Sequence, residues 1–108
     1  MARVKLVIIF PNPSDPRTLD QALISQTFLT LWAGLYGNMD GKLTRVLGAP
    51  NGLPPFFRIM EVYFPSREKL EAWLASREAQ AVAAETIAIS SGGTPTFLVC
   101  DEAMLPLG

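Results

Sequence analysis

The sequence predicts an α+β fold with the element order βαββαβ, and three observations predict it. Four short segments are rich in β-branched and aromatic residues and alternate in polarity, as half-buried strands do. Longer helical stretches follow the first and the third of these segments. The chain has 108 residues, of which 49% are hydrophobic, which suits a single domain over residues 1–108. This order is that of a ferredoxin-like fold, a four-stranded antiparallel sheet with helices on one face.

The predicted strands are bounded by residues that favour turns. Residues 3–10 precede the proline-rich PNPSDP, and residues 42–48 and 56–64 flank the turn-rich APNGLPP. The fourth strand closes the segment 92–102, and the tail 103–108 is expected to be irregular. Side-chain alternation sorts the first and third strands into two rows. The row expected to face the helices holds Val4, Leu6, Ile8, Phe10, Met60, Val62 and Phe64, and the row facing away holds Lys5, Val7, Ile9, Ile59, Glu61 and Tyr63.

Three helices are expected. The first covers about residues 17–36 and ends at a Tyr-Gly-Asn glycine signal. The other two cover residues 67–75 and 77–89, because Ser66 and Ser76 are each placed to cap a helix N-terminus.

The layout leaves one face of the sheet without helices. Val7, Ile9, Ile59 and Tyr63 make that face substantially apolar. An apolar face of this size favours a partner, and twofold pairing of two copies is the simplest way to cover it. We therefore expect a homodimer that forms through the sheet face.

Composition excludes several classes of function. A net charge of -1 provides no basic surface, so neither nucleic acid nor an anionic membrane is an expected partner. The absence of histidine removes histidine-ligated haem or zinc and any triad with an imidazole base. No metal and no cofactor are expected.

Cys100 is the single cysteine and is expected to be a buried strand thiol. No secretory signal is visible, so a cytoplasmic protein is expected.

The segment QALISQTFLTLWAGLYGNM, residues 21–39, has no charged side chain. Polar residues interrupt it and no basic cluster flanks it, so it is not expected to span a membrane. On a helix its apolar side chains form stripes on three sides, which must be covered by the sheet, by other helices and by something more. That cover is the second subunit, extra core packing or a bound molecule. We favour a ligand cavity between helix and sheet, because bulky apolar side chains are mixed with a few polar ones. Its expected lining is Phe10, Ile24, Thr27, Phe28, Leu31, Trp32, Leu35, Met39, Met60, Trp73 and Ile87.

No set of titratable residues forms a convincing catalytic group. Asp20 is expected to favour a helix start through its charge. Arg58 and Glu61 lie three apart on one strand and hence on opposite faces. Arg45 and Glu61 are expected to pair across neighbouring strands. Lys5 is expected to point away from the helices.

Three stretches of the sequence resemble the EthD-like proteins, a family named for ethyl tert-butyl ether degradation. They are VKLVIIFPNPSDP, TRVLGAPNGLPPFFRIMEVYF and SREAQAVAAETIAISSGGTPTFLVCDE, which together cover most of the chain. The resemblance implies a dimeric α+β barrel. It implies little about chemistry, since the family includes oxygenase-like and accessory proteins of catabolic pathways.

One departure from the family pattern bears on function. The resemblance implies a His-x-Pro-Leu segment in the first helix followed by Pro-Gly, which would place the histidine at Phe28 and the prolines at Thr30 and Tyr36. This sequence has FLTL and YG there instead, so the histidine and both prolines are missing. Any histidine-dependent activity is therefore in doubt, and one hypothesis is a site rebuilt by engineering for an apolar ligand of sterol size. The sequence thus predicts a binder of a small lipophilic molecule rather than an enzyme. The alternatives are a cofactor-free, oxygenase-like enzyme or accessory protein of a catabolic pathway, and a structural dimer with a solid core.

Overall fold

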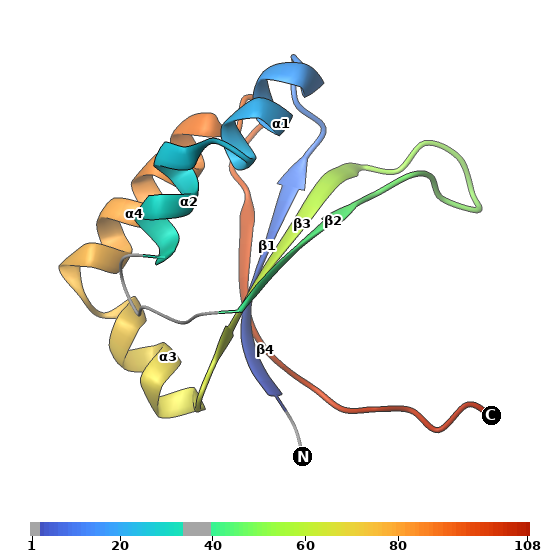
Figure 1. The fold of residues 1–108 in the computed structure, drawn as a ribbon. Coiled ribbons are helices and arrows are strands. Elements are labelled where there is room, and N and C mark those ends of the chain that lie inside the picture. Colours follow the sequence, from blue (N-terminus) through green and yellow to red (C-terminus); the bar gives the residue numbers. More distant parts are fainter. Residues whose placement is uncertain (1–2, 34–39) are drawn as a thin grey trace.

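The computed structural model describes residues 3–33 and 40–108, and these form one four-stranded antiparallel sheet with helices on one side (Figure 1). The order along the chain is β1 (Arg3–Pro11), α1 (Pro16–Leu23), α2 (Gln26–Ala33), β2 (Gly41–Arg45), β3 (Phe56–Phe64), α3 (Arg67–Leu74), α4 (Arg77–Ile89) and β4 (Thr96–Glu102). The strand order across the sheet is β2-β3-β1-β4. The predicted ferredoxin-like α+β fold is therefore confirmed.

Strand register places the two predicted rows of side chains on opposite faces. β1 pairs with β3 so that Ile8 lies opposite Met60, and with β4 so that Ile8 also lies opposite Phe97. Leu6, Ile8 and Phe10 are at most 2% exposed, because the helices cover this row. The core of the protein thus lies between the helix layer and the helix-facing row of the sheet.

The expected single helix over residues 17–36 is wrong as one continuous element. The structure has two helices, α1 and α2, with a break at Ile24 and Ser25. The Ser25 hydroxyl donates to the carbonyl of Ala22 at 2.8 Å and accepts from the amide of Phe28 at 3.2 Å. This serine thereby ends one helix and caps the next, a local competition that serine side chains commonly win. The predicted residues 34–36 lie outside the described residues.

The other two helices are confirmed at their predicted caps. The Ser66 hydroxyl accepts from the amide of Lys69, and the Ser76 hydroxyl accepts from the amide of Ala79. α3 and α4 cover the helix side of the sheet and contribute Leu70, Trp73 and Val82 to the core.

Two segments extend away from the body on the side opposite the helices (Figure 1). One is the connection between β2 and β3, and the other is the tail that follows β4. The second strand is shorter than predicted, ending at Arg45, and all of its residues are exposed. β2 is an edge strand that pairs only with β3, so one side of it carries no strand among the described residues.

Candidate functional site

An apolar cavity of about 420 Å³ lies between the first two helices and the β2–β3 side of the sheet. Volumes of a few hundred cubic ångströms are typical of small-molecule sites. Lys42 and Glu61 alternate to the other face of the sheet, so their main chain completes the wall. The lining is Leu23, Ile24, Leu29, Trp32, Asp40, Gly41, Lys42, Leu43, Met60, Glu61 and Val62.

The protein covers the wall of this cavity only in part. Ile24 is 66% exposed, Leu29 is 47% exposed and Leu43 is 39% exposed. Large aliphatic side chains gain free energy when they leave water, by roughly 1.5–3 kcal/mol for full burial. Three of them around one hollow therefore favour a further apolar occupant.

A second hollow of about 510 Å³ lies between the first two helices and α4. Its polar groups are few, and the Ser25 hydroxyl is already satisfied by the main chain of the α1–α2 break. The lining is Ala22, Ser25, Thr27, Phe28, Leu31, Ala81, Glu85 and Ile89.

The residues expected to line one cavity are thus distributed over several places. Ile24, Trp32 and Met60 line the first cavity. Thr27, Phe28 and Leu31 line the second hollow instead, because they lie on a different side of α2 from the cavity residues Leu29 and Trp32. Sequence reasoning did not assign Leu43 and Val62 to the cavity, although strand alternation places Val62 in the same row as Met60.

The other expected lining residues differ in position. Phe10 is fully buried and Trp73 is 5% exposed, and both belong to the core. Ile87 is 43% exposed near the end of α4. Leu35 and Met39 lie outside the described residues.

An aromatic cluster connects the cavity wall to the core. The rings of Trp32 and Trp73 are 5.5 Å apart between centroids, and Phe64 lies at the same distance from Trp73. Both indole Nε1–H groups are buried and have no hydrogen-bond partner in the described part of the chain. Because Trp32 lines the cavity, we expect tryptophan emission to change when a molecule enters there.

A partly buried ion pair joins Arg58, in the same row of β3 side chains as Met60, to Asp20 on α1. Arg58 is 9% exposed, and its guanidinium Nε and Nη2 each lie 2.7 Å from Oδ1 of Asp20 on α1. Arg58 is two residues before Met60, and Asp20 is one turn before Leu23. The sequence indicated only a helix-start role for Asp20, since the pair joins residues 38 apart.

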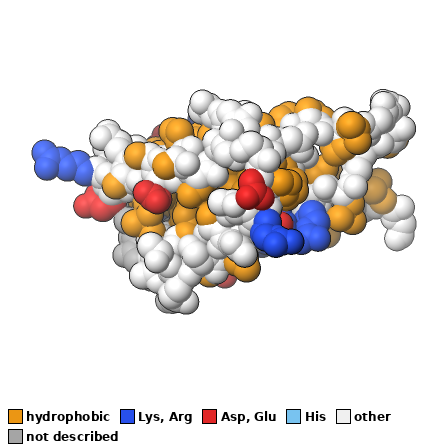
Figure 2. Space-filling model, turned by 90° about the horizontal axis from the view of Figure 1, so that it is seen from above, with side chains coloured by type: hydrophobic (Ala, Val, Ile, Leu, Met, Phe, Trp, Pro, Cys, Tyr) orange, Lys and Arg blue, Asp and Glu red, His pale blue; other side chains and the backbone are white. Residues whose placement is uncertain are grey.

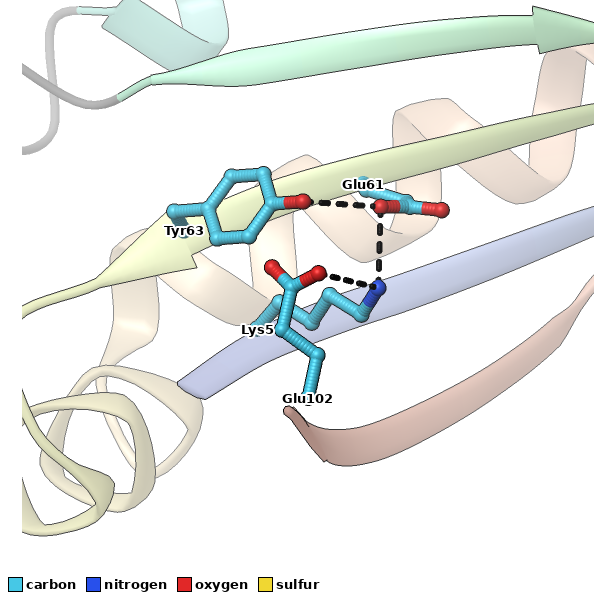
Figure 3. Close-up of polar contacts among 4 residues, drawn as sticks. All are labelled: Lys5, Glu61, Tyr63 and Glu102. Carbon is cyan, nitrogen blue, oxygen red and sulfur yellow. Dashed lines mark hydrogen bonds and ion pairs between the residues drawn. The ribbon is translucent and has the colours of Figure 1, made fainter. Parts of the chain in front are cut away.

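A polar cluster occupies the sheet face that has no helices (Figure 3). Lys5 Nζ donates to Glu61 Oε2 at 3.1 Å, and the Tyr63 hydroxyl donates to the same oxygen at 3.1 Å. Glu102 Oε2 lies 3.8 Å from Lys5 Nζ. The expected pairing of Arg45 with Glu61 is wrong, because the register places Arg45 opposite Arg58 and Lys42 opposite Glu61.

Contacts within the polar cluster stabilise the charged forms of Lys5 and Glu61. Burial alone would raise the pKa of Glu61, but hydrogen bonds from Lys5 and Tyr63 and the positive charges of Lys5 and Lys42 lower that pKa below its ordinary value. Burial alone would lower the pKa of Lys5, but the hydrogen bond to Glu61 and the charges of Glu61 and Glu102 raise it. Glu61 is therefore anionic and Lys5 cationic at neutral pH, which makes them a structural pair rather than a proton donor and acceptor poised for exchange.

Two further features of the described residues concern possible partners. They contain no group of three or more histidine, cysteine, aspartate or glutamate side chains that could hold a metal ion. No helix among them has the length and hydropathy needed to cross a bilayer.

Cys100 is a free thiol on β4 and is half-buried rather than fully buried, because it lies opposite Lys5 on the sheet face without helices.

These features define a ferredoxin-like α+β protein whose helix layer leaves an apolar cavity against the sheet. A crystal structure of an EthD family protein from Bacillus halodurans is similar, with 26% identity, a TM-score of 0.79, and coverage of 94% of this chain and 99% of that one. The EthD-like resemblance predicted from the sequence is thereby confirmed.

Two further solved structures share the fold at lower identity. One is a protein of Arabidopsis thaliana, with 16% identity, a TM-score of 0.64, and coverage of 97% of this chain and 98% of that one. The other is a dimeric ferredoxin-like protein of unknown function from Jannaschia sp. CCS1, with 16% identity, a TM-score of 0.60, and coverage of 96% and 100%. The sequence matches no family model, and a search of curated proteins found no match.

Proposed function

We propose that this chain binds a small lipophilic molecule, of sterol size or similar, in the cavity between the first two helices and the sheet. The observation that carries the proposal is the incomplete cover of Ile24, Leu29 and Leu43 around a hollow of about 420 Å³. Three or four such contacts, at roughly 1.5–3 kcal/mol each, support binding in about the micromolar range after the costs of association.

The chemistry of the wall favours an apolar ligand over a polar one. The helix residues of the lining, Leu23, Ile24, Leu29 and Trp32, are aliphatic or aromatic. The partly buried charges of Arg58 and Asp20 neutralise each other. A polar ligand would lose its hydration there without gaining enough hydrogen bonds in return. The same pairing occupies both the acid and the base of the Asp20–Arg58 pair, which favours binding over catalysis.

We also propose that two copies pair through the sheet face that has no helices. The face contains Val7, Ile9, Ile59 and Leu98, of which Leu98 is 43% exposed. The similar protein from Jannaschia is described as dimeric. The cytoplasmic location and the single domain over residues 1–108 that the sequence indicates stay predictions.

Ligand binding is tested by titrating the protein with cholesterol or 8-anilinonaphthalene-1-sulfonate and following tryptophan emission. We expect Leu43→Arg to weaken binding at least tenfold, because it places a charge on the cavity wall at an exposed edge strand. Ala81→Arg is the matched control, since it adds the same charge to the second hollow on an exposed position of α4. Loss of binding in Ala81→Arg alone would move the site to the second hollow. If neither probe changes the tryptophan emission of the unaltered protein, the proposal that the cavity binds a lipophilic molecule is refuted.

A further inference from the structure

The two segments that extend from the sheet are strongly apolar. We call residues 46–55 the hairpin arm and residues 103–108 the C-terminal arm. Neither contains a charged residue. Their large side chains are among the most exposed in the described part of the chain: Leu47 89%, Leu53 97%, Met104 93%, Leu105 72% and Leu107 89%. In Figure 2 hydrophobic side chains, and none that are charged, appear at the end of the molecule away from the helices.

The hairpin arm is held in place at its base. The amide of Val46 donates to the carbonyl of Phe57 at 3.1 Å, and the Asn12 side chain donates to the carbonyl of Pro54 at 2.8 Å. Pro50, Pro54 and Pro55 restrict its backbone further. An arm that is already ordered loses little conformational freedom when it meets a partner.

Both arms project on the same side of the molecule as the sheet face without helices (Figure 1). They therefore flank the surface through which we propose that two copies pair. A partner that covers the sheet would lie beside the apolar side chains of both arms. In a single copy these side chains stay exposed.

The charges on the face between the arms neutralise one another within one chain. Arg3 pairs with Asp40 at 3.7 Å, and Lys5 pairs with Glu61 at 3.1 Å and with Glu102 at 3.8 Å. Lys42 lies with its Nζ 5.2 Å from the Tyr63 ring centroid. The face thus carries as many cations as anions: Arg3, Lys5 and Lys42 against Asp40, Glu61 and Glu102. Such a face can lie against an identical face without net repulsion, whereas a strongly acidic or basic partner would gain nothing from it.

From these contacts we infer that the hairpin arm and the C-terminal arm clasp a second copy of this chain, each arm burying its leucines against the partner. The inference rests on the proposed pairing through the sheet face and adds the segments that hold it. Because a twofold dimer contains each arm twice, each substitution removes two contacts at once. Burying one leucine is equivalent to about a tenfold change in affinity, so one leucine lost on both chains is about hundredfold.

The test is sedimentation equilibrium of the full chain and of four variants over a wide concentration range, with circular dichroism as a check of folding. We expect Leu47→Ser/Leu53→Ser and Leu105→Ser/Leu107→Ser each to raise the dimer dissociation constant at least hundredfold. Ile87→Ser is the control, an exposed apolar residue on α4 that should leave it unchanged. Ile59→Lys should abolish the dimer by charging the sheet face.

The outcomes separate the two proposals. A dimer that Ile59→Lys dissociates but that neither arm variant weakens by more than threefold overturns the clasp and leaves the sheet pairing standing. An unaltered protein that is monomeric at every concentration overturns both. A dimer that survives Ile59→Lys forms through another surface, and this too overturns both.

Discussion

Removal of the Asp20 carboxylate should destabilise the fold far more than removal of a surface carboxylate. Asp20→Asn leaves the Arg58 guanidinium, whose side chain is 11% exposed, without its counter-ion. Hydrogen bonds to charged groups contribute about 1.5–3 kcal/mol, and loss of one partner of a fully buried pair costs more. Because the Asp20 side chain is 31% exposed, water compensates in part, and we expect a loss of about 2 kcal/mol.

The control is an ion pair of the same chemistry in water. Arg67 Nε lies 2.9 Å from Glu71 Oε1, with side chains 73% and 57% exposed. Exposed pairs spaced i,i+4 contribute about 0.3–0.5 kcal/mol, so Glu71→Gln should have little effect.

Urea unfolding and thermal unfolding, each at one fixed protein concentration, measure both losses. We expect Asp20→Asn to lower the thermal midpoint by about 10 °C and Glu71→Gln by about 2 °C. Adding Arg58→Met to Asp20→Asn should recover part of the loss, since no uncompensated charge then remains buried. Equal losses for the two single variants, or a double variant weaker than Asp20→Asn, would refute the claim that burial decides the strength of these pairs.

Two more predictions concern the polar cluster and one close contact. Glu61→Gln should lower the free energy of unfolding by about 1–2 kcal/mol at neutral pH. This difference between the two proteins should disappear below pH 4.5, the ordinary pKa of glutamate in the unfolded chain, as the pH falls through the lowered pKa of folded Glu61. A difference that persists in urea unfolding at acid pH would contradict this. Gly92→Ala should cost about 2 kcal/mol or more, since a Cβ there would lie 1.7 Å from the main-chain oxygen of Asn12. Gly48→Ala meets nothing within 4 Å and should stay within about 0.5 kcal/mol in the same melts.

The fold was predictable because its signals are local. Strand alternation in residues 3–10 and 56–64 placed Ile8 and Met60 in one row, and the structure pairs them directly. Ser66 and Ser76 cap the helices that they were expected to cap. Each of these features depends on residues within one turn or one strand, where the physical preferences of side chains are strong.

The site was harder to predict because it depends on contacts between distant residues. The break at Ser25 rests on a side chain that bonds the main chain on both sides. Ile24 at this break and Phe28 on α2 line different hollows. The register of β2 places Arg45 opposite Arg58, and the register of β1 with β3 brings Lys5 within reach of Glu61. No sequence pattern states either register. Helical periodicity indicated apolar stripes on one continuous helix, and it could predict neither the break in that helix nor which stripe a neighbouring helix would cover.

The edge strand β2 links the two proposed interactions. Its successive residues Lys42 and Leu43 face opposite sides of the sheet: Lys42 lies over the Tyr63 ring on the face proposed for pairing, and Leu43 lines the cavity. Because β2 pairs only with β3, nothing else among the described strands restrains it. A partner that packs against Lys42 therefore restrains Leu43 as well, and a ligand that packs against Leu43 orders the strand that carries Lys42. Two proposals that rest on opposite faces are thus joined through one short strand, so pairing and ligand binding should favour each other.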